Sequence, residues 1–209
     1  TSGWTPPIMW TRPERLQMRC TPGFLLLAAL MIYLCDDLAL LGYAISSAAI
    51  HELGHVAAAA AQGGRPERLT LSLAGAELFF GYRQPLSYGR ESLVALAGPC
   101  ANLLVGVPAL KLGQYLPAAI CLGLGCFNLL PILPLDGGVI LYDLISARFG
   151  PERGELVLAI SAGILIGALL GLGAAALACY ANGTLLLTAL WLLAGAVRPT
   201  AGAEMQKFR

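Results

Sequence analysis

The sequence predicts an all-α polytopic membrane protein with about six transmembrane helices and a membrane-associated β-hairpin between the second and third spans. The first observation is composition, because 57% of the 209 residues are hydrophobic and only 12% are charged. A soluble domain needs more charge than this to cover its surface. The second is that long stretches of Leu, Ala, Gly, Val and Ile contain almost no ionisable residue, so lipid is their natural solvent. The third is the distribution of Lys and Arg between alternate loops.

Six apolar segments can be drawn as spans, at residues 24–34, 38–62, 93–112, 115–135, 156–180 and 184–197. The first and last are short for a bilayer that requires about 20 helical residues. If both termini lie inside, all of the 13 Lys and Arg residues except Lys111 fall on the inner side. Because cytoplasmic loops carry an excess of these residues, we expect a multi-pass protein of the cell membrane with both termini cytoplasmic. The net charge of +1 does not indicate a nucleic-acid partner; the bilayer is the expected partner.

The longest polar connection, residues 63–91, has the alternation of a β-hairpin. Arg68-Leu-Thr-Leu-Ser-Leu alternates with period two, Ala74-Gly75 supplies a turn, and Leu78-Phe79-Phe80 follows. Its strands are too apolar for water, so we expect the hairpin to dip into the membrane or to pack on the helices.

The second span contains the sequence His51-Glu52-Leu53-Gly54-His55. On a helix, residues four apart project from one face about 6 Å along the axis, so the two imidazoles can bind one metal ion. Zinc accepts nitrogen and oxygen ligands and keeps one position open for water, whose pKa it lowers so that Glu52 can take the proton. The alternative is that these are polar residues packed between helices. Ionisable groups in hydrocarbon are costly and usually functional, and His51 and His55 are the only histidines.

A third ligand must be a carboxylate, because no histidine remains. The carboxylates inside or beside the apolar segments are Asp36, Asp37, Glu77, Glu91, Asp136, Asp143 and Glu155. In the predicted topology the second span runs inward, which leaves Asp36 and Asp37 at its outer end, away from the histidines. The fourth span runs the same way and ends at Pro134-Leu135-Asp136-Gly137-Gly138, where proline and glycine loosen the helix and turn Asp136 inward. The alternative is a simple turn after a span; we predict a zinc ligand.

The two motifs together, His51–His55 and Asn128-Leu-Leu-Pro131-Ile-Leu-Pro134-Leu-Asp136-Gly-Gly, resemble those of the site-2 protease family of intramembrane zinc metalloproteases. The second motif is closest to the branch that includes the stage IV sporulation protein FB. The resemblance covers residues 24–150, including Ala97-Gly98-Pro99 and Asn102 in the intervening span. It implies a cytoplasmic segment at 1–23, a three-helix catalytic core at 24–150 with the hairpin near 68–88, and two further spans with a short cytoplasmic tail at 151–209.

The resemblance also implies a function, namely hydrolysis of a peptide bond in or near a transmembrane segment of a membrane-associated protein substrate, with the site toward the cytoplasm. By the same analogy the hairpin offers a strand edge to the unwound substrate, Asn128 holds the substrate backbone, and Asn102 assists. The alternative for either asparagine is a hydrogen bond between helices. We expect neither the PDZ domain nor the CBS domain of other family branches here, and a regulatory membrane partner is left unidentified.

Two other functions compete with this interpretation. A membrane zinc protease of the prenyl-protein type would need a glutamate ligand on a later helix, for which Glu152 and Glu155 are poorly placed. A zinc transporter or a scaffold without hydrolysis would need further metal sites along a path, and the sequence offers neither a third histidine nor a second carboxylate cluster.

Overall fold

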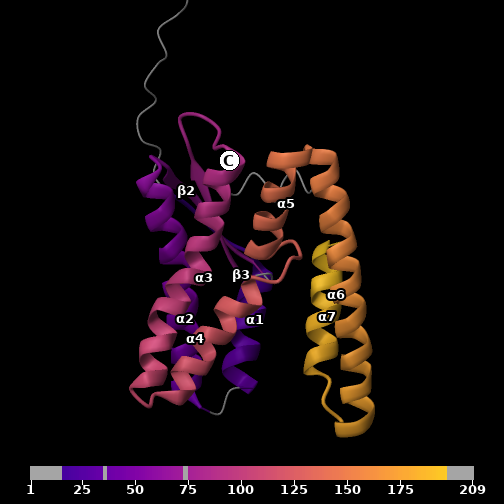
Figure 1. The fold of residues 1–209 in the computed structure, drawn as a ribbon. Coiled ribbons are helices and arrows are strands. Elements are labelled where there is room, and N and C mark those ends of the chain that lie inside the picture. Colours follow the sequence, from indigo (N-terminus) through magenta and orange to yellow (C-terminus); the bar gives the residue numbers. More distant parts are fainter. Residues whose placement is uncertain (1–15, 35–36, 73–74, 197–209) are drawn as a thin grey trace, which may run out of the picture.

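The computed structural model describes residues 16–34, 37–72 and 75–196, and within them the chain forms seven helices and one three-stranded sheet (Figure 1). In chain order the elements are β1 (Gln17–Cys20), α1 (Pro22–Leu34), α2 (Leu38–Ala61), β2 (Arg65–Ser72), β3 (Gly75–Gly81), α3 (Tyr88–Lys111), α4 (Tyr115–Asn128), α5 (Asp136–Phe149), α6 (Pro151–Tyr180) and α7 (Thr184–Ala196). Six of these helices overlap the six predicted apolar segments. The predicted positions of Asp36, Arg12, Arg15, Arg198, Lys207 and Arg209 lie outside the described residues.

One prediction was wrong, because residues 115–135 do not form a single span. Helix α4 ends at Asn128 and a separate helix, α5, begins at Asp136. Proline lacks an N–H group and its ring clashes with the preceding turn, so Pro131 and Pro134 end the helix. The chain resumes as a helix with an acidic residue in its first turn and Arg148 in its last, which suits the helix dipole.

The predicted hairpin is present and packs on the helices. Strands β2 and β3 pair antiparallel, with Leu69 opposite Leu78, and Leu78 and Phe80 are buried in a core cluster with Val94 of α3 and Val139 of α5. The sheet also contains β1, which pairs parallel to β2 in the order β1-β2-β3. This strand was not predicted within the segment 1–23. A parallel pair needs a long crossover, and α1 and α2 supply it.

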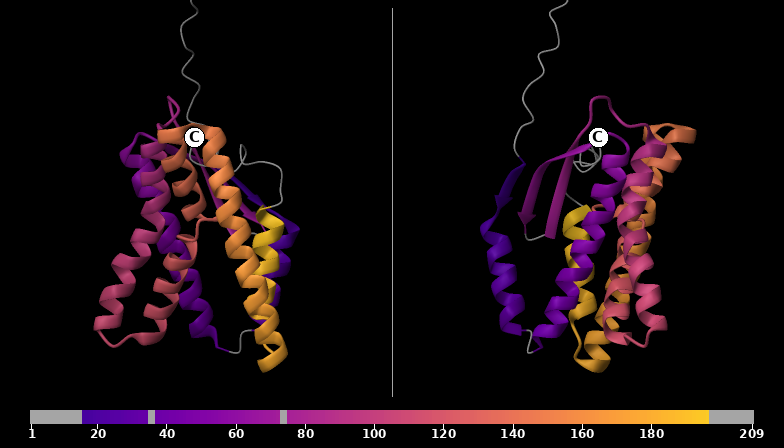
Figure 2. Two further views of the ribbon diagram at one scale, coloured as in Figure 1. Left: turned by 45° about the vertical axis from the view of Figure 1, so that its right-hand side comes forward. Right: turned by 90° about the vertical axis from the view of Figure 1, so that its left-hand side faces the viewer.

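The helix ends separate into two groups. The end of α1, the start of α2 and the α3–α4 and α6–α7 connections lie at one end of the molecule, and the α2–β2 connection, the start of α3 and the α5–α6 junction lie at the other (Figures 1 and 2). Arg65, Arg90, Arg148 and Arg153 belong to elements at the second end, whereas Lys111 ends α3 at the first. These four arginines thus lie at the opposite end from Lys111; the orientation of the chain in a membrane stays a prediction.

Two of the described helices, α3 and α6, are long and apolar enough to cross a membrane, which fits membrane association. The count of six spans is not confirmed. Helices α1, α4 and α7 have 13, 14 and 13 residues, fewer than the roughly 20 that a bilayer requires. Helix α2 has 24 residues, but its serines, histidines and Glu52 lower its mean hydropathy.

Candidate metal centre

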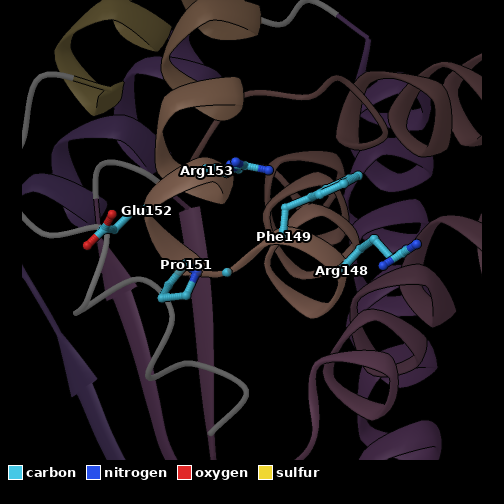
Figure 3. Close-up of a pocket in the computed structure, with 6 residues that line it drawn as sticks. Arg148, Phe149, Pro151, Glu152 and Arg153 are labelled. Carbon is cyan, nitrogen blue, oxygen red and sulfur yellow. The ribbon is translucent and has the colours of Figure 1, made fainter.

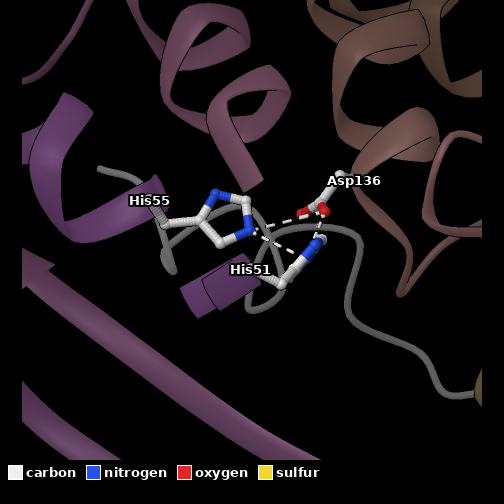
Figure 4. A group of neighbouring side chains, drawn as sticks. All are labelled: His51, His55 and Asp136. Atoms are coloured by element: carbon white, nitrogen blue, oxygen red, sulfur yellow. Dashed lines mark hydrogen bonds and ion pairs between the residues drawn. The ribbon is translucent and has the colours of Figure 1, made fainter. Parts of the chain in front are cut away.

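Three donor atoms from two helices meet at one point in the interior (Figure 4). His51 and His55 lie one turn apart on α2, and Asp136 is the first residue of α5. The Nε2 atoms of the histidines are 3.1 Å apart, and Oδ2 of Asp136 lies 3.0 Å from Nε2 of His51 and 3.4 Å from Nε2 of His55. The three residues are only 6%, 1% and 4% exposed. The structure thus brings the three predicted ligands together, in a site closed to bulk water.

The spacing of these atoms fits a zinc ion. Zinc binds nitrogen and oxygen at about 2.0–2.1 Å, so two corners of its tetrahedron are about 3.3 Å apart. The three measured edges, 3.0, 3.1 and 3.4 Å, form a triangle of nearly that size. Two imidazoles and one carboxylate would supply three ligands to such an ion, and zinc takes a fourth from water or substrate. Within the described residues this is the one group of three such donors.

The orientation of the His55 ring is fixed by the neighbouring helix. Its Nδ1–H group donates a hydrogen bond to the Val94 carbonyl of α3, at 2.8 Å. A proton on Nδ1 leaves the lone pair on Nε2, which is the atom that faces Asp136. The His51 ring stands edge-on to it, at 85° and with centroids 4.7 Å apart. Nδ1 of His51 is buried and has no hydrogen-bond partner among the described residues.

Glycines allow the close approach of α2 and α3 at this level. A Cβ atom on Gly98 would collide with the His55 ring and lie 2.9 Å from Cε1 of His51. On the other helix, a Cβ atom on Gly54 would collide with the Ala97 carbonyl. The two imidazoles therefore lie directly against the α3 backbone, which explains the glycine at position 98 physically.

Asp136 reaches the site because α5 starts beneath the 129–135 loop. Cβ atoms on Gly137 and Gly138 would collide with the backbone of Leu129 and Ile132, respectively, so only glycine allows this approach. The buried side chains of Ile132 and Leu135 anchor the loop against α6 and α7. We predicted an inward turn at the end of a broken helix; the structure instead places Asp136 in the first turn of a new helix, where the helix dipole favours a carboxylate.

Glu52 follows His51 on α2 and is half-buried. Its Oε2 atom is shielded from solvent and has no hydrogen-bond partner among the described residues. The carboxylate does not belong to the three-donor group. Its Oε2 atom is therefore an unengaged acceptor on the residue next to His51 in the chain.

The two predicted substrate-binding asparagines lie in different surroundings. Asn102 is fully buried, and its Nδ2 group donates to Oγ of Ser47 at 3.0 Å and to the Cys121 carbonyl at 3.1 Å. It therefore joins α2, α3 and α4, which favours the alternative of a hydrogen bond between helices. Asn128 is half-buried at the end of α4 and donates to the Leu124 carbonyl at 3.0 Å, so its amide contacts its own helix.

A second buried polar group lies between α3 and α5. Glu91 and Asp143 are fully buried, and Ser92 donates to Oδ2 of Asp143 at 3.3 Å. We had considered both carboxylates only as possible metal ligands, and neither joins the three-donor group. Outside the spans, burial and then the negative charge of Glu91 raise the pKa of Tyr82 from 10.0 to about 12. An ionisable residue beside an apolar segment marks these carboxylates in the sequence, but not the helix that each contacts.

Comparisons with known proteins agree with this site. No family model matches the chain. A Synechocystis protein with the provisional name zinc metalloprotease sll0528 is 34% identical over 146 residues, covering 57% of this chain and 38% of that protein. Zinc metalloprotease MJ0392 of Methanocaldococcus jannaschii is 29% identical over 116 residues, covering 50% of this chain and 33% of that protein. The matched region thus spans little more than a third of these relatives.

Among solved structures, the site-2 protease from Methanocaldococcus jannaschii superposes with a TM-score of 0.65 and 24% sequence identity. The match covers 92% of this chain and 90% of that one. A likeness at this identity establishes the fold. The chain therefore has a site-2 protease fold, mostly helical with a small sheet, and a donor set suited to zinc.

Proposed function

We propose that this chain is a membrane zinc metalloprotease of the site-2 type, which hydrolyses a peptide bond in or near a transmembrane segment of a membrane-associated protein. The observation that carries the proposal is the triangle of buried donors from His51, His55 and Asp136, with the Glu52 carboxylate beside it. The similarity to proteins named zinc metalloproteases supports it. Assignment to the sporulation branch rests on the motif around Asp136 and is part of the proposal.

In this proposal His51, His55 and Asp136 hold the zinc ion. The ion supplies Lewis acidity, which polarises a carbonyl and makes water a nucleophile near neutral pH. Glu52 takes the proton of the attacking water and later gives it to the leaving amine. The hydrogen bond from His55 to Val94 keeps the ring in the orientation that this chemistry needs. The buried position of the donors strengthens every electrostatic interaction with the developing oxyanion.

A helical substrate must unwind before it is cut, because its carbonyls are engaged in intrahelical hydrogen bonds. Strand β3 is the last strand of the sheet order β1-β2-β3, so it has an edge to which an extended segment can add. Asn128, at the end of α4 where the 129–135 loop begins, is our proposed contact to the substrate backbone. We assign Asn102 to packing between helices, on the basis of its hydrogen bonds to Ser47 and Cys121; a role at the substrate stays a prediction.

We also propose that the site opens toward the cytoplasm, that the chain is multi-pass, and that both termini are cytoplasmic. The proposal rests on the arginines at the end of the molecule where α2 ends and α3 begins, and on Lys111 at the other end. A regulatory membrane partner would act from this side.

The test is co-expression with candidate single-pass substrates, comparing wild type with Glu52→Gln. We expect cleavage to fall by about 10²–10⁴-fold, the usual contribution of a general base, while purified Glu52→Gln retains wild-type zinc content. Glu152→Gln, an exposed carboxylate on α6, is the matched control and should cleave normally. Cleavage that persists in Glu52→Gln would overturn the mechanism, and zinc flux into vesicles that survives in this variant would favour a transporter instead.

A further inference from the structure

Two arginines flank one aromatic ring at the corner between α5 and α6 (Figure 3). Arg148 lies in the last turn of α5 and Arg153 in the first turn of α6. Their guanidinium carbons lie 5.6 and 5.7 Å from the centroid of the Phe149 ring, within reach of a cation–π interaction. All three side chains are exposed, and they line an open recess of about 510 Å³.

The positive charge of this recess is not neutralised within the described part of the chain. Neither Arg148 nor Arg153 forms an ion pair with a carboxylate there. Glu152 also lines the recess, but its carboxylate points away from both guanidinium groups (Figure 3). Glu155 is two residues beyond Arg153, so it projects from another side of the helix. Two unneutralised like charges that line one recess repel each other, so an anion that contacts the recess is favoured, and guanidinium groups match phosphate oxygens in pairs.

An exposed apolar stripe begins directly beside the recess. On α6, Leu156, Ile160 and Ile164 follow Arg153 at helical spacing and are 59%, 54% and 67% exposed. Helix α6 is one of the two helices long and apolar enough to cross a membrane. On α5, the exposed Leu144 lies one turn before Arg148. The surface therefore changes within one helical turn from basic to apolar, on the same face.

We propose that this recess binds the phosphate head group of an anionic phospholipid, with an acyl chain along the Leu156–Ile164 stripe of α6. A basic recess between helices at the membrane surface is suited to such head groups. The apolar stripe distinguishes a lipid from a soluble anion, because only a lipid gains from contact with it. Phe149 contacts both guanidinium groups, and all three side chains line the recess. This inference does not rest on the proposed protease function.

The experiment is native mass spectrometry of the full chain in detergent, titrated with phosphatidylglycerol, phosphatidylcholine of the same chains, or inorganic phosphate. We expect phosphatidylglycerol to bind more tightly than phosphatidylcholine. The double variant Arg148→Ala/Arg153→Ala should lose about 10- to 30-fold in affinity for phosphatidylglycerol, the effect of two basic residues at a membrane surface. Arg148→Lys/Arg153→Lys should recover only part of it, because lysine does not form paired hydrogen bonds to phosphate.

The matched control is Arg65→Ala/Arg90→Ala, which removes two exposed arginines from elements at the same end of the molecule. It should keep wild-type affinity for phosphatidylglycerol. An equal loss in this control would show general attraction to a basic surface and overturn the site. Inorganic phosphate that competes at the same concentration as phosphatidylglycerol would overturn the lipid assignment, as would a phosphatidylcholine affinity equal to that for phosphatidylglycerol. Both double variants change exposed side chains, and their melting temperatures check that they are folded.

Discussion

The α2–α5 region and the α6–α7 pair are held together by different interactions. Between α2 and α5 the interior contains a set of buried polar side chains, namely Ser47, His51, His55, Glu91, Ser92, Asn102, Asp136, Asp143 and Ser146. In α6 and α7 the buried residues of the described structure are glycine, alanine, leucine and isoleucine. Both regions are helical and both are apolar on average, so hydropathy alone does not separate them.

The difference determines what each region tolerates. A buried polar group that loses its partner costs the free energy of its desolvation, so the α2–α5 region depends on particular residues. Apolar packing tolerates exchanges that conserve volume, so the α6–α7 pair depends mainly on shape. A metal site needs donors held within fractions of an ångström. The three-donor site of this protein lies in the α2–α5 region, which depends on particular residues.

The largest effect we expect is that of Asp136→Asn on zinc binding. The amide is uncharged and a poor zinc ligand. Loss of a residue that only supports a ligand lowers zinc affinity by up to about 100-fold, so loss of a direct ligand should lower it by more than that and should abolish cleavage. Zinc content after dialysis against a zinc buffer is the measurement. Asp37→Asn is the control, because Asp37 caps α2 at its far end and asparagine caps equally well. Wild-type zinc content in Asp136→Asn would remove this residue from the ligand set.

The next effect compares the same substitution in the two regions. Gly98→Ala should displace the His55 ring, because the new methyl group occupies its position; we expect loss of zinc and a destabilisation of about 1–3 kcal/mol. Gly167→Ala on α6 meets nothing within 4 Å and should stabilise the helix by about 0.5–1 kcal/mol. Zinc content and thermal unfolding in detergent measure both. If Gly98→Ala keeps its zinc and its melting temperature, α3 does not confine the histidines as we describe.

A third comparison sets the loss of a buried hydrogen-bond donor in the α2–α5 region against an apolar exchange that conserves volume in α7. Asn102→Leu leaves Ser47 and the Cys121 carbonyl without their common donor, which should cost about 1–3 kcal/mol of stability. Leu192→Met, at a fully buried position of α7, conserves volume and should cost less than about 1.5 kcal/mol. In the folded fraction of Asn102→Leu, KM should be unchanged. A raised KM at unchanged stability would restore Asn102 as a substrate contact.

The sequence predicted those features that follow from local pattern and from topology. Apolar length located most helices, and the spacing of His51 and His55 on one helix face required no tertiary information. Asp136 was identified only because the distribution of Lys and Arg indicated that the second and fourth spans both run inward, which places Asp136 and the two histidines toward the same side of the membrane. The start of α3 was predicted five residues late, at 93 instead of Tyr88, because Glu91 and Ser92 are polar by sequence and buried only by contact with α5.

Features that depend on tertiary contact were missed. Helix α5, Asp136–Phe149, follows two prolines and contains Asp136, Asp143 and Arg148, so it was not predicted as an apolar segment. Strand β1 has four exposed residues and no alternation of its own; it exists because β2 offers it an edge. The contact of Asp143 with Ser92 could not be read from sequence, since α3 and α5 become neighbours only in the fold.

The smallest expected effect shows how far the buried charge of the α2–α5 region acts. Burial, and then the charge of Glu91, raise the pKa of Tyr82 from 10.0 to about 12. The unfolded chain loses this proton near pH 10 while the folded chain keeps it, so the associated stability is complete below pH 10 and is lost as pH rises toward 12. Tyr82→Phe should therefore flatten the decline in melting temperature between pH 10 and 12.

At pH 8 the free energy of unfolding of Tyr82→Phe should lie within about 1 kcal/mol of the wild-type value. The Tyr82 hydroxyl has no hydrogen-bond partner among the described residues, so its removal leaves no neighbouring polar group without a partner. Tyr180→Phe, at the exposed end of α6, is the control from the other region and should leave the alkaline decline unchanged. Ultraviolet difference titration should show one late-titrating tyrosine fewer in Tyr82→Phe only. Because burial is the larger cause, we expect Glu91→Gln to shift the late titration of Tyr82 to lower pH without removing it. If Glu91→Gln abolishes the late titration completely, the charge of Glu91 outweighs burial.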